Sequence, residues 1–164
     1  MIEVFANRIE ISNPGRPIVD PMRFIDYPPR SRNEGFASLM RRMGICEERG
    51  SGFDKVVFQT EFYQLPPPMI EVTESNTLVV LFAYKKFKDM DRSDRIHACY
   101  LHACLKFVNR EKMTNKSLRE RFGIDDKNSA MVSRIISDAV SVGLIKRENV
   151  DESKKYSRYV PFWA

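Results

Sequence analysis

The sequence predicts an α+β chain in two parts, a mixed region of strands and helices over residues 1–88 and a helical region closed by a hairpin over residues 89–164. Apolar and polar residues alternate in the first dozen positions, which is typical of strands. From residue 96 onwards, apolar residues recur at helical spacing instead. The charged stretch at 85–95 separates the two patterns, and we place the domain boundary there.

Strands are expected in the first region at residues 2–5, 8–11, 69–72 and 77–84. The first two could also form one bent strand, and the segment SNPGRP that follows them should end any strand, because proline lacks an amide donor. The residues ESN between the last two strands predict a hairpin turn. The final strand is apolar enough to lie in the centre of a sheet.

Two helices complete the first region. Apolar residues at 36, 39, 40 and 43 fall on one helix face, and Gly44 should end that helix. Apolar residues at 53, 56, 57 and 62 indicate a second helix, closed by the three prolines at 66–68. We expect this region to serve as a scaffold that aids self-association.

Three helices and a terminal hairpin are expected in the second region. The first helix carries apolar residues from Ile96 to Val108, and the second begins at the N-cap Thr114 and ends at Gly123. The third, capped by Asp125 or Asp126, should run to Val142. A strand starting at 144–145, a charged turn at 149–153 and a returning strand at 155–163 complete the pattern. This order predicts a winged helix-turn-helix.

The third helix has a surface suited to double-stranded DNA. With Val132 at the centre of the buried face, Ile136, Ala139 and Val140 lie within about 80° of it, at ~100° per residue. The opposite face then holds small and cationic side chains, namely Lys127, Ala130, Arg134, Ser137 and Ser141, with Ser133 at its border. Small residues permit close approach to a groove, Arg134 can reach a guanine edge with two hydrogen bonds, and Ser133 or Lys127 can reach a phosphate.

The hairpin supplies further cations. Those that flank its turn are Lys146, Arg147, Lys154, Lys155 and Arg158. Side chains of this kind suit backbone phosphates beside the major groove.

The net charge of +5 lies entirely in the second region. Residues 1–87 carry 11 Lys and Arg against 11 Asp and Glu, whereas residues 88–164 carry 16 against 11. A basic half joined to a neutral half is typical of a domain that faces phosphate. An alternative from another class stays open, because a winged helix can also dock onto a protein or a dimer mate, with no DNA bound.

Cysteine usage and hydropathy bear on the compartment. The three cysteines, Cys46, Cys99 and Cys104, are odd in number and irregularly spaced, which favours a reducing, cytoplasmic location over a disulfide framework. No run approaches 18 apolar residues and no signal pattern opens the chain, so we expect no membrane association.

Three motifs carry a family resemblance: NRIEISNPG at 7–15, RNEGFASL at 32–39 and GICEERGSG at 44–52. In order and spacing they resemble the C-terminal region of bacterial proteins described as putative ATP-dependent DNA helicase, RecG-related. Such proteins also carry an AlbA-type, Schlafen-like DNA-binding domain and are often described as transcriptional regulators. The resemblance covers about residues 2–60. It implies that upstream domains of the same parent protein are partners of this chain and that a homodimer is possible.

That family region is similar to the ATP-binding fold of the GHKL ATPases, such as gyrase and histidine kinases. The resemblance therefore implies a partial GHKL-like α/β layer ahead of the winged helix. Asn13, Pro14 and Gly15 would stand at the adenine-contacting box, and Gly50, Ser51 and Gly52 at the phosphate loop. Two departures suggest a degenerate site. Asn7 replaces the family's first aspartate, and the segment that would hold Mg²⁺ should lie upstream of this sequence.

Enzymatic and metal chemistry are not expected. The sequence contains no GxxxxGK[ST] motif and no DExx box, so neither helicase activity nor a bound cofactor is predicted. His97, Cys99, His102 and Cys104 lie close together, but the cysteines also fit the apolar helix stripe, which favours a buried structural role over zinc binding. With only two histidines, a nucleophilic catalytic group is not predicted. Phe82, Tyr84 and Phe87 are expected to be core residues rather than base-stacking platforms.

Overall fold

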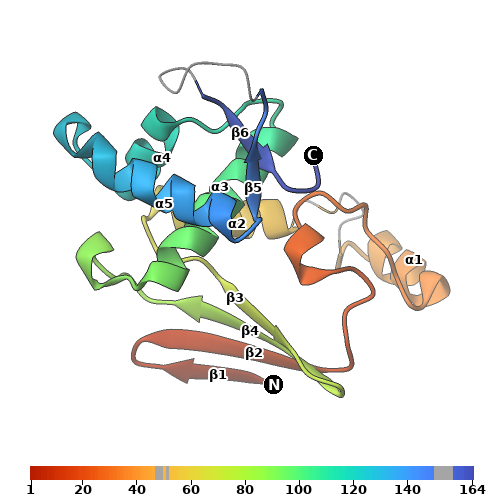
Figure 1. Ribbon diagram of the computed structural model, residues 1–164. Coiled ribbons are helices and arrows are strands. Elements are labelled where there is room, and N and C mark those ends of the chain that lie inside the picture. The colour runs from red at the N-terminus through yellow and green to blue at the C-terminus, as the bar shows by residue number, and fades with distance from the viewer. Residues whose placement is uncertain (47–49, 51, 150–156) are drawn as a thin grey trace.

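A four-stranded sheet lies at one end of the molecule, and a helical body with a small hairpin lies at the other (Figure 1). The computed structural model describes residues 1–46, 50, 52–149 and 157–164. The strands are β1 (Ile2–Phe5), β2 (Arg8–Pro14), β3 (Met69–Val72), β4 (Asn76–Phe82), β5 (Ile145–Arg147) and β6 (Tyr159–Pro161). The helices are α1 (Glu34–Arg42), α2 (Gly52–Phe62), α3 (Arg92–Val108), α4 (Asn115–Phe122) and α5 (Ser129–Ser141), with short 3-10 helices at 21–23, 87–89 and 126–128.

The sheet is antiparallel with the order β1-β2-β4-β3, so β4 lies between two neighbours as its apolar sequence predicts. The turn between β3 and β4 is also confirmed, and Thr73 closes it by donating its amide to the carbonyl of Asn76 at 2.9 Å. The prediction that SNPGRP ends the second strand is wrong in part, because β2 continues to Pro14. The nitrogen of Pro14 faces the side where β1 has already ended, so its missing amide costs no ladder hydrogen bond.

The hydrophobic core surrounds α3. Its residues from Ala98 to Leu105 are all buried, including those opposite the predicted stripe, because α2, α4, α5 and β6 pack around it. Val57 of α2 and Ile25 of the first region belong to the same buried cluster as Leu118 and Val132. The core therefore crosses from residues 1–88 into residues 89–164.

The start of the third helix differs from the prediction. Residues Asp126–Asn128 form a 3-10 helix, and α5 begins only at Ser129 after the N-cap Asn128, so neither Asp125 nor Asp126 caps it. The predicted buried face is shifted as well, since Ile135 is buried and Val140 is exposed. Because α5 packs against both α3 and α4, its buried arc is centred between Val132 and Ile135 rather than on Val132.

The apolar face of α1 is formed but not buried. The helix spans Glu34–Arg42 with Gly44 just beyond it at a φ of +70°, as the sequence predicts. However, Phe36, Leu39 and Met43 are 59%, 52% and 65% exposed. In Figure 1, α1 projects to one side of the molecule, away from the helices of the core.

The aromatic residues at the end of the first region have different environments. Phe87 packs on the core with its ring 5.0 Å from that of Phe122, as predicted. Tyr84 is exposed, so the expectation of a core position is wrong for this residue. Within the described part of the chain, no helix combines the length and apolar character that a membrane span needs.

Candidate nucleic-acid interface

The outward face of α5 carries small and cationic side chains. Arg134, Ser133, Ser137 and Ser141 are all exposed, whereas Val132, Ile136 and Ala139 on the other side are buried. The helix is therefore fixed to the body through one face and leaves the other free. Among the residues that the structure describes, none forms an ion pair with Arg134, so its guanidinium has its donors available.

Asn115 links α4 to the first turns of α5. Its amide nitrogen donates to the carbonyl of Ser129 at 3.1 Å and to the hydroxyl of Ser133 at 3.0 Å. Arg119 donates to the side-chain oxygen of Asn115 at 3.0 Å and pairs with Asp126. Ser133 is thus a member of this network at the start of α5 as well as an exposed residue.

The acidic residues near this face have cationic partners. Asp138 accepts two hydrogen bonds from Arg92, at 2.8 and 3.1 Å, and these hydrogen bonds lower the pKa of that carboxyl. Lys127 lies 3.5 Å from Asp125, with both side chains well exposed. Lys127 stands on the 3-10 helix before α5, not on α5 itself as predicted, because α5 starts later than expected.

The hairpin expected from the sequence is present as β5 and β6, which pair antiparallel. Its cations do not share one face. Lys146 lies opposite Val160 and Arg158 follows the same alternation, whereas Arg147 lies opposite Tyr159 on the other face. Lys146 donates to the carbonyl of Ala164 at 2.5 Å. Lys154 and Lys155, together with most of the predicted turn, lie outside the described residues.

Two cationic residues near α5 are not among the DNA-binding residues that the sequence predicts. Lys116 is exposed on the first turn of α4, and Arg92 holds Asp138 from the start of α3. Neither belongs to the third helix or the hairpin, so a pattern confined to those elements could not include them. An exposed lysine just after the N-cap Thr114 is the signal that could have identified Lys116.

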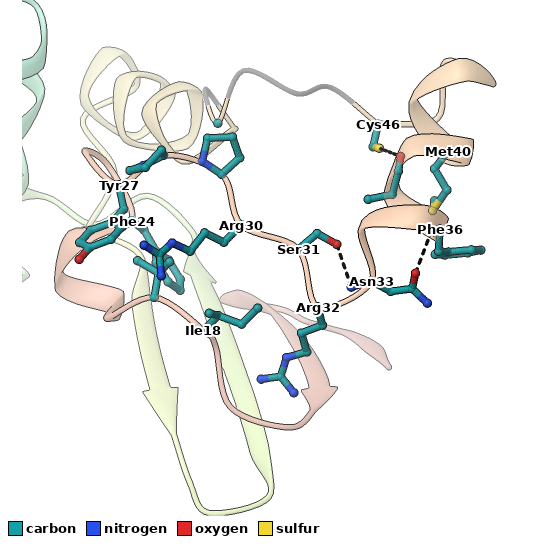
Figure 2. Close-up of a pocket in the computed structure, with 15 residues that line it drawn as sticks. Ile18, Phe24, Tyr27, Arg30, Ser31, Arg32, Asn33, Phe36, Met40 and Cys46 are labelled. Atoms are coloured by element: carbon teal, nitrogen blue, oxygen red, sulfur yellow. Dashed lines mark hydrogen bonds between the residues drawn. The ribbon is translucent and has the colours of Figure 1, made fainter.

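A hollow of about 600 Å³ lies between α1 and the loop that precedes it, and Figure 2 shows the residues that line it. Apolar side chains dominate its wall, and Arg30 and Arg32 stand at its edge. Gly50 also lines it, and a Cβ there would lie 3.0 Å from Cδ of Pro29.

The predicted nucleotide positions do not meet in this hollow. Gly15, at a φ of +87°, is held at the end of the sheet, where its amide donates to Ser75 and its carbonyl accepts from Thr77. Asn13 is exposed on β2 next to it, and Gly52 begins α2. Among the lining residues, only Gly50 comes from the predicted set, and Ser51 lies outside the described residues.

A buried polar chain joins the first region to α3 and α4. The ring of His102 lies 2.9 Å from the carboxylate of Glu61 through Nδ1 and 3.1 Å from the hydroxyl of Ser117 through Nε2. The residue types match those of a hydrolase triad, but Ser117 also bonds both the amide and the carbonyl of Thr114 in the capping box of α4. Arg121 lies beside Glu61, with 3.9 Å between Nε and Oε1. No local sequence pattern predicts this contact, because its members come from three helices.

The cysteines of α3 are inert in this arrangement. Cys99 and Cys104 are fully buried, and burial raises the pKa of Cys104 to about 12. Burial likewise raises the pKa of Cys99 and lowers that of the neighbouring His97. No group of three or more potential metal ligands occurs within the described part of the chain.

Comparison with protein-family models gives one family, described as putative ATP-dependent DNA helicase recG C-terminal, which matches residues 1–82. The match extends beyond the motifs at 7–52 to the end of β4, and so includes the whole four-stranded sheet. Comparison with curated proteins and with solved structures found no match.

Proposed function

This chain belongs to the family of putative ATP-dependent DNA helicase recG C-terminal domains, and from that premise we propose that it is the DNA-binding module of a transcriptional regulator. Residues 89–164 would form a winged helix-turn-helix that binds double-stranded DNA. Residues 1–82 would connect this module to the other domains of the parent protein.

The observation that carries the proposal is the exposed face of α5. An arginine without an ion pair to any described residue stands among serines on a helix whose other side is anchored in the core. A duplex groove favours this combination, because small residues let the backbone approach and a guanidinium can donate twice to a guanine edge. α4 packs beside α5 and is linked to it by Asn115, as the helix preceding a recognition helix is placed beside it.

In the proposed complex α5 enters the major groove, with Arg134 toward O6 and N7 of a guanine. Ser137 and Ser141 face the groove floor or the sugars. Lys116 and Lys127 approach phosphates on one side of α5, and Lys146 and Arg158, which share one face of the hairpin, do so on the other. The proposal involves no catalytic step and no cofactor.

Fluorescence anisotropy with a labelled random duplex, measured at two salt concentrations, tests this function. Phosphate contacts release counterions, so the affinity should fall steeply as salt rises. Arg134→Ala should weaken binding by ~1–3 kcal/mol at a preferred site and relax the sequence preference. Docking of the winged helix onto a protein instead would leave the duplex unbound at both salt concentrations.

Arg42→Ala provides a matched control. Arg42 is an exposed arginine on α1, and α1 lies far from α5 in Figure 1. Its substitution removes the same charge from the chain as Arg134→Ala does. Its affinity for the duplex should stay near that of the parent protein. Equal losses in the two variants would mean that only net charge attracts the duplex, and the orientation proposed for α5 would be wrong.

A further inference from the structure

One face of the four-stranded sheet is aliphatic from edge to edge. Cross-strand pairing aligns Ile2 with Ile11, Val4 with Ile9 and Ile9 with Leu81, and continues the row through Val79 to β3. The face consists of Ile2, Val4, Ile9, Ile11, Ile70, Val72, Val79 and Leu81, with Asn13 and Thr77 at one end. It contains no charged residue.

None of these eight side chains is buried. Val4, Ile2 and Ile9 are 76%, 69% and 38% exposed, and the other five are partly exposed. Val80, the neighbour of Val79 on the same strand, points to the opposite face and is 2% exposed. The Val80 face is therefore covered at Val80 itself, whereas no position of the aliphatic face is buried.

The opposite face shows that this composition is not a general feature of the sheet. Glu3, Arg8, Glu10 and Glu71 alternate with the aliphatic residues along the strands and lie on the Val80 side. Glu3 and Glu71 are exposed there, so charge lies on the Val80 face, whereas the aliphatic face lacks it. Large uncharged patches on an exposed surface are typical of sites of protein association.

We propose that this aliphatic face binds the same face of a second copy of the chain. In a two-fold dimer each surface meets itself, so any charge on it would meet a like charge near the axis. A face with no charge at all avoids that repulsion. Two aliphatic sheet faces can pack about 10 Å apart with interdigitated side chains, as the two sheets of a β-sandwich do.

The size of the face sets the expected strength of the dimer. Four strands about 4.8 Å apart, with ~3.3 Å per residue, give a surface of roughly 400 Å² before side-chain relief is counted. Two such faces bury roughly 800 Å² in total, which is below the range of stable interfaces (about 1,200–2,000 Å²) and typical of weak association. The dimer should therefore dissociate on dilution.

The arrangement leaves the α5 surface open. β1 is the strand farthest from the helices in Figure 1, and α5 belongs to the helical body, away from β1. A dimer through the sheet would carry two copies of the proposed DNA-binding surface. The inference does not depend on DNA binding, because it rests only on the sheet.

Sedimentation velocity of the full chain, over a range of concentrations, tests the dimer. The parent protein should shift from monomer to dimer as concentration rises. The double variant Val4→Glu and Ile9→Glu should remain a monomer throughout, because the pair puts carboxylates into the interface. Val4→Glu alone, at the most exposed of the eight positions, should shift the transition at least tenfold higher in concentration. Circular dichroism checks that each variant is folded.

Two matched controls separate the proposed face from general stickiness. Glu3→Lys changes the neighbouring residue on the opposite face of β1, and Leu39→Glu places the same charge on the exposed apolar side of α1. Both should dimerise like the parent. The proposal would be overturned if the parent protein stayed monomeric at every concentration. That result would mean that the aliphatic face binds another domain or binds nothing. Dissociation by Leu39→Glu with the double variant still dimeric would overturn it equally.

Discussion

The two regions of this molecule use similar amphipathic patterns with different results. In the second region, the apolar faces of α3, α4 and α5 meet in one closed core. In the first, the apolar side of α1 and one whole face of the sheet remain exposed. Only α2 and a few loop residues of the first region share the core around α3.

The difference shows that an amphipathic pattern specifies a helix or a strand but not what packs against its apolar face. A helix or a sheet with an apolar face needs a second layer against it, and that layer can come from the same chain or from another. The second region contains its own layers. The first region leaves apolar surface on α1 and on the sheet without such a layer among the described residues.

The largest expected difference is in the free energy of unfolding, when the same leucine-to-alanine change is made in each of the two regions. Leu118→Ala creates a cavity in the core, because Leu118 is fully buried, and should lower the free energy of unfolding by ~2–5 kcal/mol. Leu39→Ala on α1 removes an exposed side chain and should cost less than about 0.5 kcal/mol. Urea denaturation measures both. Similar costs would show that α1 is packed in solution and would refute the contrast.

A smaller effect is expected at the contact between the regions. Glu61→Ala leaves His102 without its carboxylate partner and Arg121 without its nearest anion, which should cost ~2 kcal/mol. Glu61→Gln keeps an oxygen for His102 and should cost less. Thermal denaturation compares the two. If both variants melted at the parent temperature, this buried polar chain would not hold α2 to α3 and α4.

Two glycines with similar backbone conformations should also differ in the stability that is lost on substitution, with the larger loss in the second region. Gly123 ends α4 at a φ of +61°, and a Cβ there would lie 2.8 Å from Nε2 of Gln64. Gly123→Ala should cost about 1–2 kcal/mol, because a residue with a Cβ is strained in this conformation. Gly44→Ala, at +70° after α1, meets the same strain in open space and should only fray α1. Urea denaturation should detect the first change and barely register the second.

The smallest expected effect is a loss of stability at mildly acidic pH. Burial lowers the pKa of His97 in the folded protein, partly offset by Asp94, whereas the unfolded chain should titrate near the ordinary value of about 6.5. Below that pH the unfolded state binds more protons, so stability should fall as the pH drops. Melting temperatures from pH 7.5 to 5.5 should decrease, and His97→Gln should flatten the decrease. A parallel decrease in the variant would exclude His97 as the cause.

The sequence predicts elements better than their surroundings. Helical spacing located α3, the cap Thr114 and Gly123 located α4, alternation located β1 and β2, and the apolar run at 77–84 located β4, because these signals are local. The start of α5 was missed, since Asp126–Asn128 form a tighter helix that the apolar pattern does not encode. Ile135 was missed as a buried residue because the exact direction of α5 depends on α3 and α4 together.

The candidate site likewise has features that the sequence predicts and features that only the structure shows. The exposure of Ser133, Arg134 and Ser137 follows from helical geometry alone and is confirmed. The roles of Asn115 and of Arg92 with Asp138 depend on contacts between helices distant in sequence, which no local pattern reveals. Likewise, the alternation of β1 and β2 shows that one face is aliphatic, but only the structure shows that this face is the uncovered one.

A ¹⁵N nuclear magnetic resonance titration of the chain with duplex DNA tests the central claim most directly, because each amide reports its own region. The largest shifts should fall on residues 129–141 and on the first turn of α4, with smaller ones along β5 and β6. The sheet and α1 should change little. Shifts concentrated on the sheet or on α1, with α5 unchanged, would contradict the assignment of DNA binding to the exposed face of α5.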